Sequence, residues 1–231
     1  MLSVLRAEGS AFADACLAAG GSAAVESCPG WTVDDLLWHM VEVHHFWTWI
    51  VRDARDTWEG YERPPRPDRT ELPHHFTTGF AEMCDVLGRV SGDQTNWTWS
   101  TRRDAAFVLR RMVHELAVHR WDADRAAGRT RSVAADVASD GIDEFLTHFL
   151  GDPPAGSVHL HCTDVDGEWM VRSDALGSKQ VTREHAKGDV ALRGAASDLL
   201  LVLWRRRELS TVEVFGASDL ASGFLAATDL D

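Results

Sequence analysis

The sequence predicts a two-domain protein in which a four-helix bundle precedes a smaller α+β domain. Apolar residues recur at helical spacing through residues 1–130. After the segment GRTRS the pattern changes to short alternating runs typical of strands, separated by further helices. A proline-rich stretch, YERPPRPD, supplies one long connection within the helical part, as some bundles have. We therefore expect domains over 1–130 and 131–231, and a chain of 231 residues is long enough to give each a core.

Four helices are expected in the first domain. The first ends at the Gly20-Gly21 pair, and the second begins after Thr32, a residue type that caps helix N-termini. Asp34 and Asp35 then favour the positive end of that helix dipole. Gly128 ends the fourth helix. The expected ranges are 2–20, 33–58, 71–91 and 104–127.

The second domain is expected to mix helices with a sheet. Its first helix covers 133–150. The runs SVHLHCTD and EWMVRS alternate on either side of VDG, which indicates a hairpin. Two further strands, DVALRG and TVEVFG, flank a helix in AASDLLLVLWRRR, and ASDLASGFLAA forms the last helix.

Composition excludes several classes of function. The formal net charge of −13 argues against nucleic acid or an anionic membrane as a partner, because both require a basic surface. The four cysteines show neither CxxC pairs nor zinc-finger spacing and fit reduced thiols. The N-terminus lacks an apolar signal core, and the longest apolar run, LLLVLW, is too short to span a bilayer. We therefore expect a cytoplasmic protein with a small-molecule partner.

Two polar residues interrupt the apolar face of the fourth expected helix. Glu115 and His119 are four residues apart, so they share one face, and they continue the apolar stripe of Val108 and Met112. His114 is five residues from His119, which excludes the HExxH motif of zinc proteases. One interpretation is an i,i+4 ion pair on a solvated face. The other is a metal site, because a buried carboxylate needs a partner.

A third candidate ligand lies on the second expected helix. His39 is in register with Val43, Phe46 and Ile50 on the edge of the inward face, whereas His44 and His45 are weaker candidates. A core histidine bonded to a carbonyl group is the alternative interpretation. Helical bundles bind metals with side chains from facing helices. Two histidines and one glutamate with an open fourth position describe a catalytic zinc centre rather than a structural one.

Three segments carry a resemblance to a known family: CPGWTVDDLLWHM at 28–40, RMVHELAVHRWDADRAAG at 111–128 and DVALRGAASDLLLVLWRRRELSTVEVFG at 189–216. They resemble the mycothiol-dependent maleylpyruvate isomerase family, over nearly the whole chain. The resemblance implies a DinB-like four-helix metal-binding domain followed by an α+β domain similar to sterol carrier proteins. It places the metal triad on His39, Glu115 and His119, with zinc as the expected ion and nickel or iron as alternatives.

The resemblance also implies a reaction. The metal binds the thiol of mycothiol and lowers its pKa. The thiolate adds to the cis double bond of maleylpyruvate, the single bond rotates, and expulsion of the thiol gives fumarylpyruvate. A C-terminal-domain arginine of the family aligns best with Arg206, where this chain departs from an LWGR-like pattern by lacking the glycine. Arg205, Arg206 and Arg207 would also suit a helix C-terminus on dipole grounds alone.

Two other functions stay open on the sequence. The same thiol could be transferred to an electrophile or xenobiotic and remain attached, which a hydrophobic cleft without paired arginines would favour. A non-catalytic, metal-stabilised protein could instead hold a small apolar ligand, which a filled fourth metal position would favour.

Several other motifs are interpreted as structural. The tryptophans, Trp97 and Trp99 among them, are expected to fill cores and interfaces rather than a ligand cleft. The histidine pair 74–75 is expected on the surface, and Cys28 in the tight turn before the second helix. Asp122 lies one turn beyond His119 and is expected to orient its ring.

Overall fold

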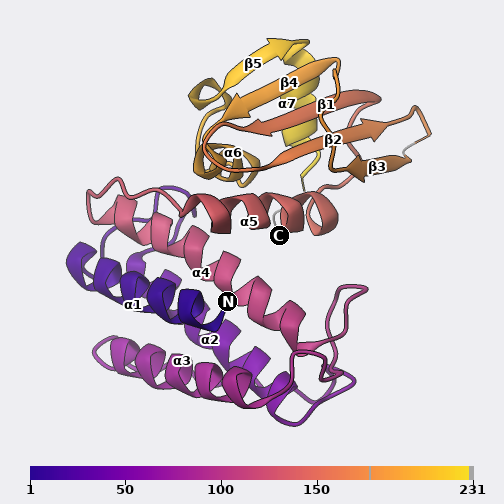
Figure 1. The fold of residues 1–231 in the computed structure, drawn as a ribbon. Coiled ribbons are helices and arrows are strands. Elements are labelled where there is room, and N and C mark those ends of the chain that lie inside the picture. The colour runs from indigo at the N-terminus through magenta and orange to yellow at the C-terminus, as the bar shows by residue number, and fades with distance from the viewer. Residues whose placement is uncertain (177, 229–231) are drawn as a thin grey trace. The chain divides into compact units, whose positions relative to one another are not determined.

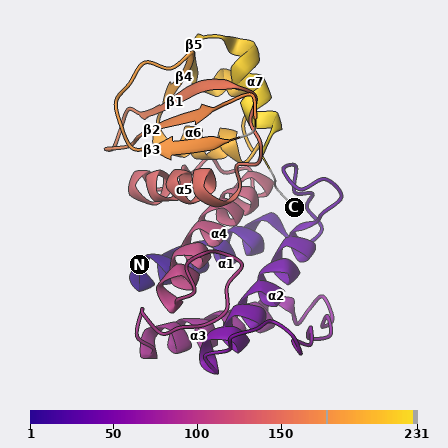
Figure 2. The same ribbon diagram turned by 90° about the vertical axis from the view of Figure 1, so that its right-hand side faces the viewer.

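The N-terminal part of the chain folds into four helices. The computed structural model describes residues 1–176 and 178–228, and divides into an N-terminal unit, Met1–Arg131, and a C-terminal unit, Ser132–Asp231. Within the first, α1 packs along α4 and α2 along α3 (Figures 1 and 2). The predicted helical fold of this half is confirmed. The helices are α1 (Leu2–Ala19), α2 (Val33–Arg52), α3 (Leu72–Arg89) and α4 (Ala105–Ala126).

Helix α2 begins as predicted but ends early. The Thr32 hydroxyl accepts from the Asp35 backbone N–H while the Asp35 carboxylate accepts from the Thr32 N–H, a complete capping box. The expected extension to residue 58 is wrong. Ala54 adopts a left-handed φ of 47°, and the Arg55 N–H turns back to the Ile50 carbonyl at 3.0 Å. That turn closes the helix at Arg52 without the glycine that usually marks such an ending.

Helix α4 is the most deeply buried element of the N-terminal unit. From Arg111 to Asp124 all but one of its side chains are buried, charged ones included. Buried charges are costly unless they are paired, so this helix requires an ordered set of polar partners. The apolar core around it includes Leu5, Phe12, Met40, Ile50, Phe76, Met83, Phe107 and Leu116.

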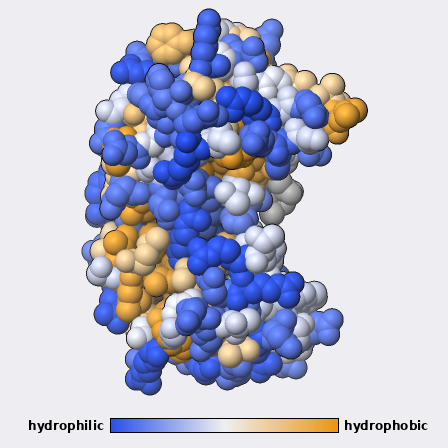
Figure 3. Space-filling model, turned by 45° about the vertical axis from the view of Figure 1, so that its right-hand side comes forward, coloured by the Kyte–Doolittle hydropathy of each residue, from blue (hydrophilic) through white to orange (hydrophobic). Residues whose placement is uncertain are grey.

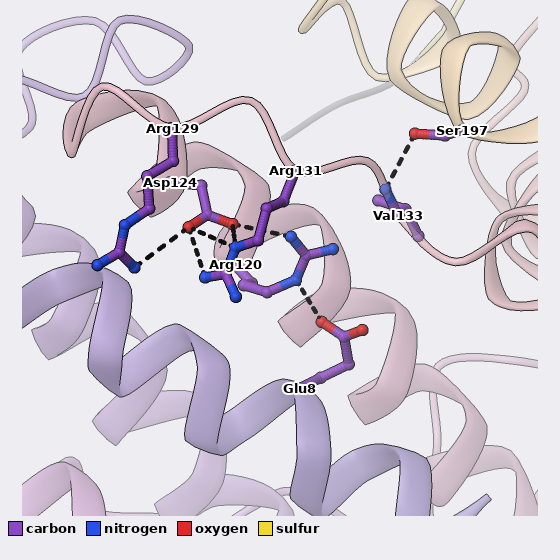
Figure 4. A network of polar contacts seen from close by, with 7 residues as sticks. All are labelled: Glu8, Arg120, Asp124, Arg129, Arg131, Val133 and Ser197. Carbon is purple, nitrogen blue, oxygen red and sulfur yellow. Dashed lines mark hydrogen bonds and ion pairs between the residues drawn. The ribbon is translucent and has the colours of Figure 1, made fainter.

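One such set of partners surrounds Asp124, whose side chain is fully shielded from solvent (Figure 4). Arg120 donates to it at 2.9 Å and Arg131 at 2.6 Å, and Arg129 lies 3.7 Å away. Arg120 also donates to Glu8 of α1 at 2.6 Å. The network joins α1 to α4 and folds the chain after α4 back onto its last turn, which fixes the helix carrying Glu115 and His119.

The C-terminal unit contains a five-stranded sheet in the order β3-β2-β1-β4-β5 (Figure 1). Strand β1 pairs antiparallel with β2 and parallel with β4. The predicted hairpin and the two later strands are confirmed, whereas β3 was not predicted, because this short edge strand is largely exposed and has no apolar alternation. The strands are β1 (Gly156–Cys162), β2 (Glu168–Ser173), β3 (Lys179–Thr182), β4 (Val190–Gly194) and β5 (Glu213–Gly216).

Helices cover one face of this sheet. Helices α6 and α7 contact β1 and β4, and α7 lies behind the sheet in Figure 1. Leu160 and Trp169 pair across β1 and β2, and the Trp169 indole donates to Asp143 of α5 at 3.2 Å. The buried Val133 N–H donates to Ser197 of α6 at 3.0 Å (Figure 4). The helices are α5 (Ala135–His148), α6 (Ala196–Leu203) and α7 (Ser218–Ala226), with a 3₁₀ turn at Leu209–Thr211.

Hydrophilic residues predominate on the face drawn in Figure 3, with smaller apolar patches among them. In the part of the chain that the structure describes, none of the helices combines the length and apolar character of a bilayer span.

Candidate metal centre

The three residues predicted as metal ligands converge within the N-terminal unit. His39 comes from α2, and Glu115 and His119 lie one turn apart on α4. His39 Nε2 is 3.1 Å from Glu115 Oε1, and His119 Nε2 is 3.4 Å from the same oxygen. The two imidazole rings approach edge to face with centroids 5.1 Å apart. A donor atom from each of the three residues therefore points to one small volume.

The spacing of these donor atoms fits a single ion. Ligand atoms that surround a tetrahedral zinc at 2.0–2.1 Å are about 3.3 Å apart. The two measured histidine–glutamate separations, 3.1 and 3.4 Å, bracket that value. Two imidazoles and a carboxylate are also a usual donor set for zinc with one position left for an external ligand. The side chains present therefore suit a divalent ion of the zinc type.

A hydrogen-bonded chain behind His119 orients its ring. His119 Nδ1 is 2.9 Å from Asp122 Oδ2, the contact that the spacing of the two residues predicted. The hydroxyl of Ser27 donates to the other carboxylate oxygen of Asp122 at 2.5 Å. Because a carboxylate can only accept, it holds the proton on Nδ1 and leaves Nε2 to act as the donor atom toward an ion.

Glu115 remains charged despite its burial. Burial would raise the pKa of Glu115, but the Arg111 guanidinium and the two histidines hold it well below its usual value. Arg111, almost fully buried, pairs with Oε2, so Oε1 is the oxygen that faces the histidines. Arg111 was not predicted as part of the site, although its position four residues before Glu115 is the spacing of a helical ion pair.

His119 is protonated more readily than a free histidine, on the ring that would bind the ion. Burial would lower its pKa, but the hydrogen bonds to Asp122 and Glu115 outweigh burial and raise the pKa to about 9. Without an ion, a proton on His119 thus compensates the negative charge of the two carboxylates. A divalent cation would take over that role, which makes proton release a direct consequence of binding.

The other histidines of α2 are separate from this cluster. His44 is fully buried beside Phe76 and Phe80, with centroids 5.3 Å away in each case, and burial lowers its pKa to about 3. His45 is exposed and hydrogen-bonds Tyr61 at 2.9 Å. Both are therefore poorer candidates as ligands of this site than His39, in line with the prediction. His114 on α4 is buried outside the group of converging donors.

Cys28 forms the expected turn and also lies near His119 of the candidate metal centre. Its backbone forms the expected turn, with the N–H donating to Val25 and the carbonyl accepting from Trp31. Its sulfur also belongs to a second group of potential ligand atoms with His119 and Asp122, all within 4.8 Å of one another. Spacing along the sequence gave no signal for this contact, because the turn is far from α4 in the chain.

The three adjacent arginines follow the end of α6 in the C-terminal unit. Arg205 adopts a left-handed φ of 55° and donates to carbonyl groups at the C-terminal end of α7 and just beyond it, among them that of Thr228 at 3.0 Å. Arg207 pairs with Asp198 at 2.5 Å. Arg206 donates to the Trp204 carbonyl at 3.0 Å. Arg205 and Arg207 thus hold the unit together, and substrate binding by Arg206 stays a prediction.

Trp47, Trp97 and the exposed histidine pair agree with their structural interpretation, whereas Trp58 and Trp99 are exposed rather than part of a core. Trp47 is buried and stacks on Trp97 with centroids 6.2 Å apart. Trp99 is partly exposed and packs edge to face on the buried Phe107. The pair at 74–75 is exposed near the start of α3.

Comparison with known proteins gives a consistent result over most of the chain. Residues 2–124 match the family model of the mycothiol maleylpyruvate isomerase N-terminal domain, and residues 136–223 match that of the C-terminal domain of the same proteins. Curated protein sequences offer no match. Two solved structures share the fold, one of mycothiol-dependent maleylpyruvate isomerase and one of a histidine-to-alanine mutant of it. Their TM-scores are 0.64 and 0.63 at 12% and 13% identity, covering 92% of this chain and 90% of each structure.

Proposed function

This chain belongs to the mycothiol-dependent maleylpyruvate isomerase family, and from that premise we propose a metal-dependent enzyme that uses mycothiol to convert a small electrophilic substrate. The preferred reaction is cis–trans isomerisation of maleylpyruvate or a similar compound. The observation that carries the proposal is the convergence of His39 Nε2, Glu115 Oε1 and His119 Nε2. The distances between these atoms are those expected between ligand atoms around a tetrahedral ion.

The proposed ion is divalent, and the mixed nitrogen and oxygen donors favour zinc. Bound between these three side chains, it would lower the pKa of a thiol at its open position and so supply a thiolate near neutral pH. Mycothiol supplies the sulfur nucleophile that can add to a double bond and leave again.

The protein's own residues prepare that site in three ways. Glu115 provides negative charge that Arg111 offsets from the far side, so that one oxygen is presented to the ion. Asp122 fixes the tautomer of His119. Trp31 packs against the His39 ring with centroids 5.3 Å apart, which supports one orientation of that ligand.

Arg206 is the proposed substrate-binding residue of the C-terminal unit. Maleylpyruvate is a dianion, and a guanidinium binds a carboxylate through two parallel hydrogen bonds that a lysine cannot reproduce. Arg206→Lys should therefore lower turnover strongly while the metal content of the protein stays normal. The matched control is Arg193→Lys, because Arg193 is an exposed arginine whose guanidinium pairs with Glu213 across β4 and β5.

Thiol transfer is the second candidate. It is favoured by the engagement of Arg205 and Arg207 within the C-terminal unit, because these contacts leave no pair of adjacent arginines dedicated to a dianion. In that reaction the sulfur stays attached to the electrophile.

A turnover experiment separates the two reactions. Purified protein loaded with zinc is given maleylpyruvate, and separately a reactive electrophile, with and without mycothiol. We expect turnover only with mycothiol and its loss in His39→Ala. An isomerised acid with the thiol regenerated identifies the isomerase, and a stable thioether identifies the transferase. Turnover that is independent of both the thiol and His39 would contradict the proposal.

A further inference from the structure

Four potential metal ligands gather on the sheet of the C-terminal unit, apart from the triad. His159 and His161 are two residues apart on β1, so their side chains leave the same face. Glu168 of β2 pairs directly with His161 and therefore shares that face. It is the opposite face from Leu160, which pairs with Trp169 on the helix side. This face therefore carries titratable side chains where the opposite face carries apolar ones.

The fourth residue reaches this face through the topology of the sheet. Strand β3 lies at one edge, and β4 lies on the far side of both β2 and β1 (Figure 1). The connection over 183–189 must therefore pass across these two strands. It brings His185 onto the histidine face, where its Nδ1 is 2.8 Å from Glu168 Oε2. Gly188 in the same connection runs close to the His159 backbone.

The four side chains converge on a common point. His161 Nδ1 is 2.6 Å from Glu168 Oε1, and His159 Nε2 is 3.6 Å from Oε2. One donor atom from each of the four residues lies within 4.8 Å of all the others. The ring centroids of His159, His161 and His185 are 5.5 to 6.3 Å apart. Three imidazoles bound to one tetrahedral ion would show separations of about 5 Å, so a small inward shift completes the geometry.

Ion pairing alone does not account for this cluster. The His159 side chain is only 9% exposed, and its Nε2 atom has no hydrogen-bond partner among the described residues. This buried nitrogen without a hydrogen-bond partner faces a carboxylate and two further imidazoles, which is how ligand atoms are arranged around a metal ion.

We propose that His159, His161, Glu168 and His185 bind a second divalent transition-metal ion, of the zinc type, independently of the triad. The nitrogen-rich donor set selects zinc, cobalt or nickel over calcium and magnesium, which prefer oxygen ligands. A cavity of about 380 Å³ borders the site and is lined by three of the four ligands and by Arg183.

The test uses the full chain with the first site removed. His39→Ala combined with His119→Ala eliminates two triad ligands and leaves the C-terminal unit unchanged. After metal loading and desalting, elemental analysis should still find one zinc per chain, and cobalt should give the visible absorption of a four-coordinate ion. Adding His185→Ala to this variant should weaken binding by on the order of 100-fold or more, because lost second-sphere contacts alone cost 10–100-fold.

The choice of variants keeps the result interpretable. The His185 side chain is 80% exposed, so its removal leaves the fold intact, and His161→Ala provides a second ligand deletion on the sheet. His74→Ala, in the exposed pair on α3, is the matched control and should leave metal content unchanged. The proposal is overturned if the triad-deleted chain binds no zinc. It is also overturned if His185→Ala and His161→Ala bind zinc as tightly as the control does.

Discussion

His119 and Asp122 are joined by a hydrogen bond of 2.9 Å between Nδ1 and Oδ2, and this contact decides which nitrogen of the ring is available as a ligand. Nε2 lies 3.4 Å from Glu115 Oε1, on the side of the ring that faces His39. Asp122 is itself held by Ser27. The proposed metal centre thus extends beyond its three ligands into a chain of oriented polar groups.

Loss of the Asp122 carboxylate should weaken metal binding without removing a ligand. Asp122→Asn keeps the shape of the side chain but no longer enforces a proton on Nδ1 of His119. We expect zinc affinity to fall by roughly 10–100-fold, measured by competition with a chelator of known affinity. Ser27→Ala, which only loosens the carboxylate, should have a smaller effect. Unchanged affinity in Asp122→Asn would show that the ring is oriented by other contacts.

Arg111 should stabilise the protein chiefly when the ion is absent. The guanidinium pairs with the largely shielded Glu115 carboxylate, so Arg111→Leu leaves only the histidines to compensate that charge. Breaking a buried pair in this way costs about 3–5 kcal/mol. We expect a free energy of unfolding lower by about that amount in metal-free protein, and a larger gain on adding zinc than the parent shows. Equal destabilisation with and without zinc would contradict this account.

Metal binding at the triad should strengthen as the pH rises. The pKa of His119 is raised to about 9, so below that pH an ion must displace a proton from its ring. Apparent affinity should then increase by about tenfold per pH unit between pH 6 and 8, which chelator competition at several pH values measures. Glu115, with its pKa held low, stays charged throughout this range. A pH-independent affinity would argue against His119 as a ligand.

Stability of the metal-free protein at acidic pH should depend on His44. Its pKa falls from 6.5 to about 3 on folding, so the unfolded chain binds the proton more readily between these values. The contribution of neutral His44 to the free energy of unfolding is therefore fully present above pH 6.5. It is lost as the pH falls, by about 2 kcal/mol at pH 5. In urea unfolding, this loss of stability between pH 6.5 and 5 should disappear in His44→Leu. It should persist in the exposed control His45→Leu. A parallel pH dependence in all three proteins would contradict it.

Local pattern was sufficient for much of the fold, whereas the triad as a metal site rested on the family resemblance as well as on helical spacing. The helical period of α4 placed Glu115 and His119 on an inward face, and the same period in α2 placed His39 opposite them. Alternation of apolar residues gave the β1–β2 hairpin. The early end of α2 escaped prediction because Ala54 adopts a left-handed conformation that usually requires glycine or asparagine.

Long-range pairing accounts for what the sequence did not reveal. Cys28 reaches His119 only through the packing of its turn against α4. His161 and Glu168 become neighbours through strand register, and His185 joins them through a connection that crosses the sheet. Histidines two residues apart in a strand were the one available signal for this second cluster. Such a spacing becomes informative only once the strand order is known.

The central claim, that the triad holds an ion able to bind an external thiol, is tested most directly by absorption spectroscopy of cobalt-substituted protein. Adding mycothiol should produce a sulfur-to-metal charge-transfer band that grows with pH, because thiol binding releases a proton. The band should persist in His185→Ala and in Cys28→Ser and vanish in His39→Ala. A band that is present before mycothiol is added and lost in Cys28→Ser would contradict the claim, because it would mean that the fourth position is already filled by the protein's own thiol.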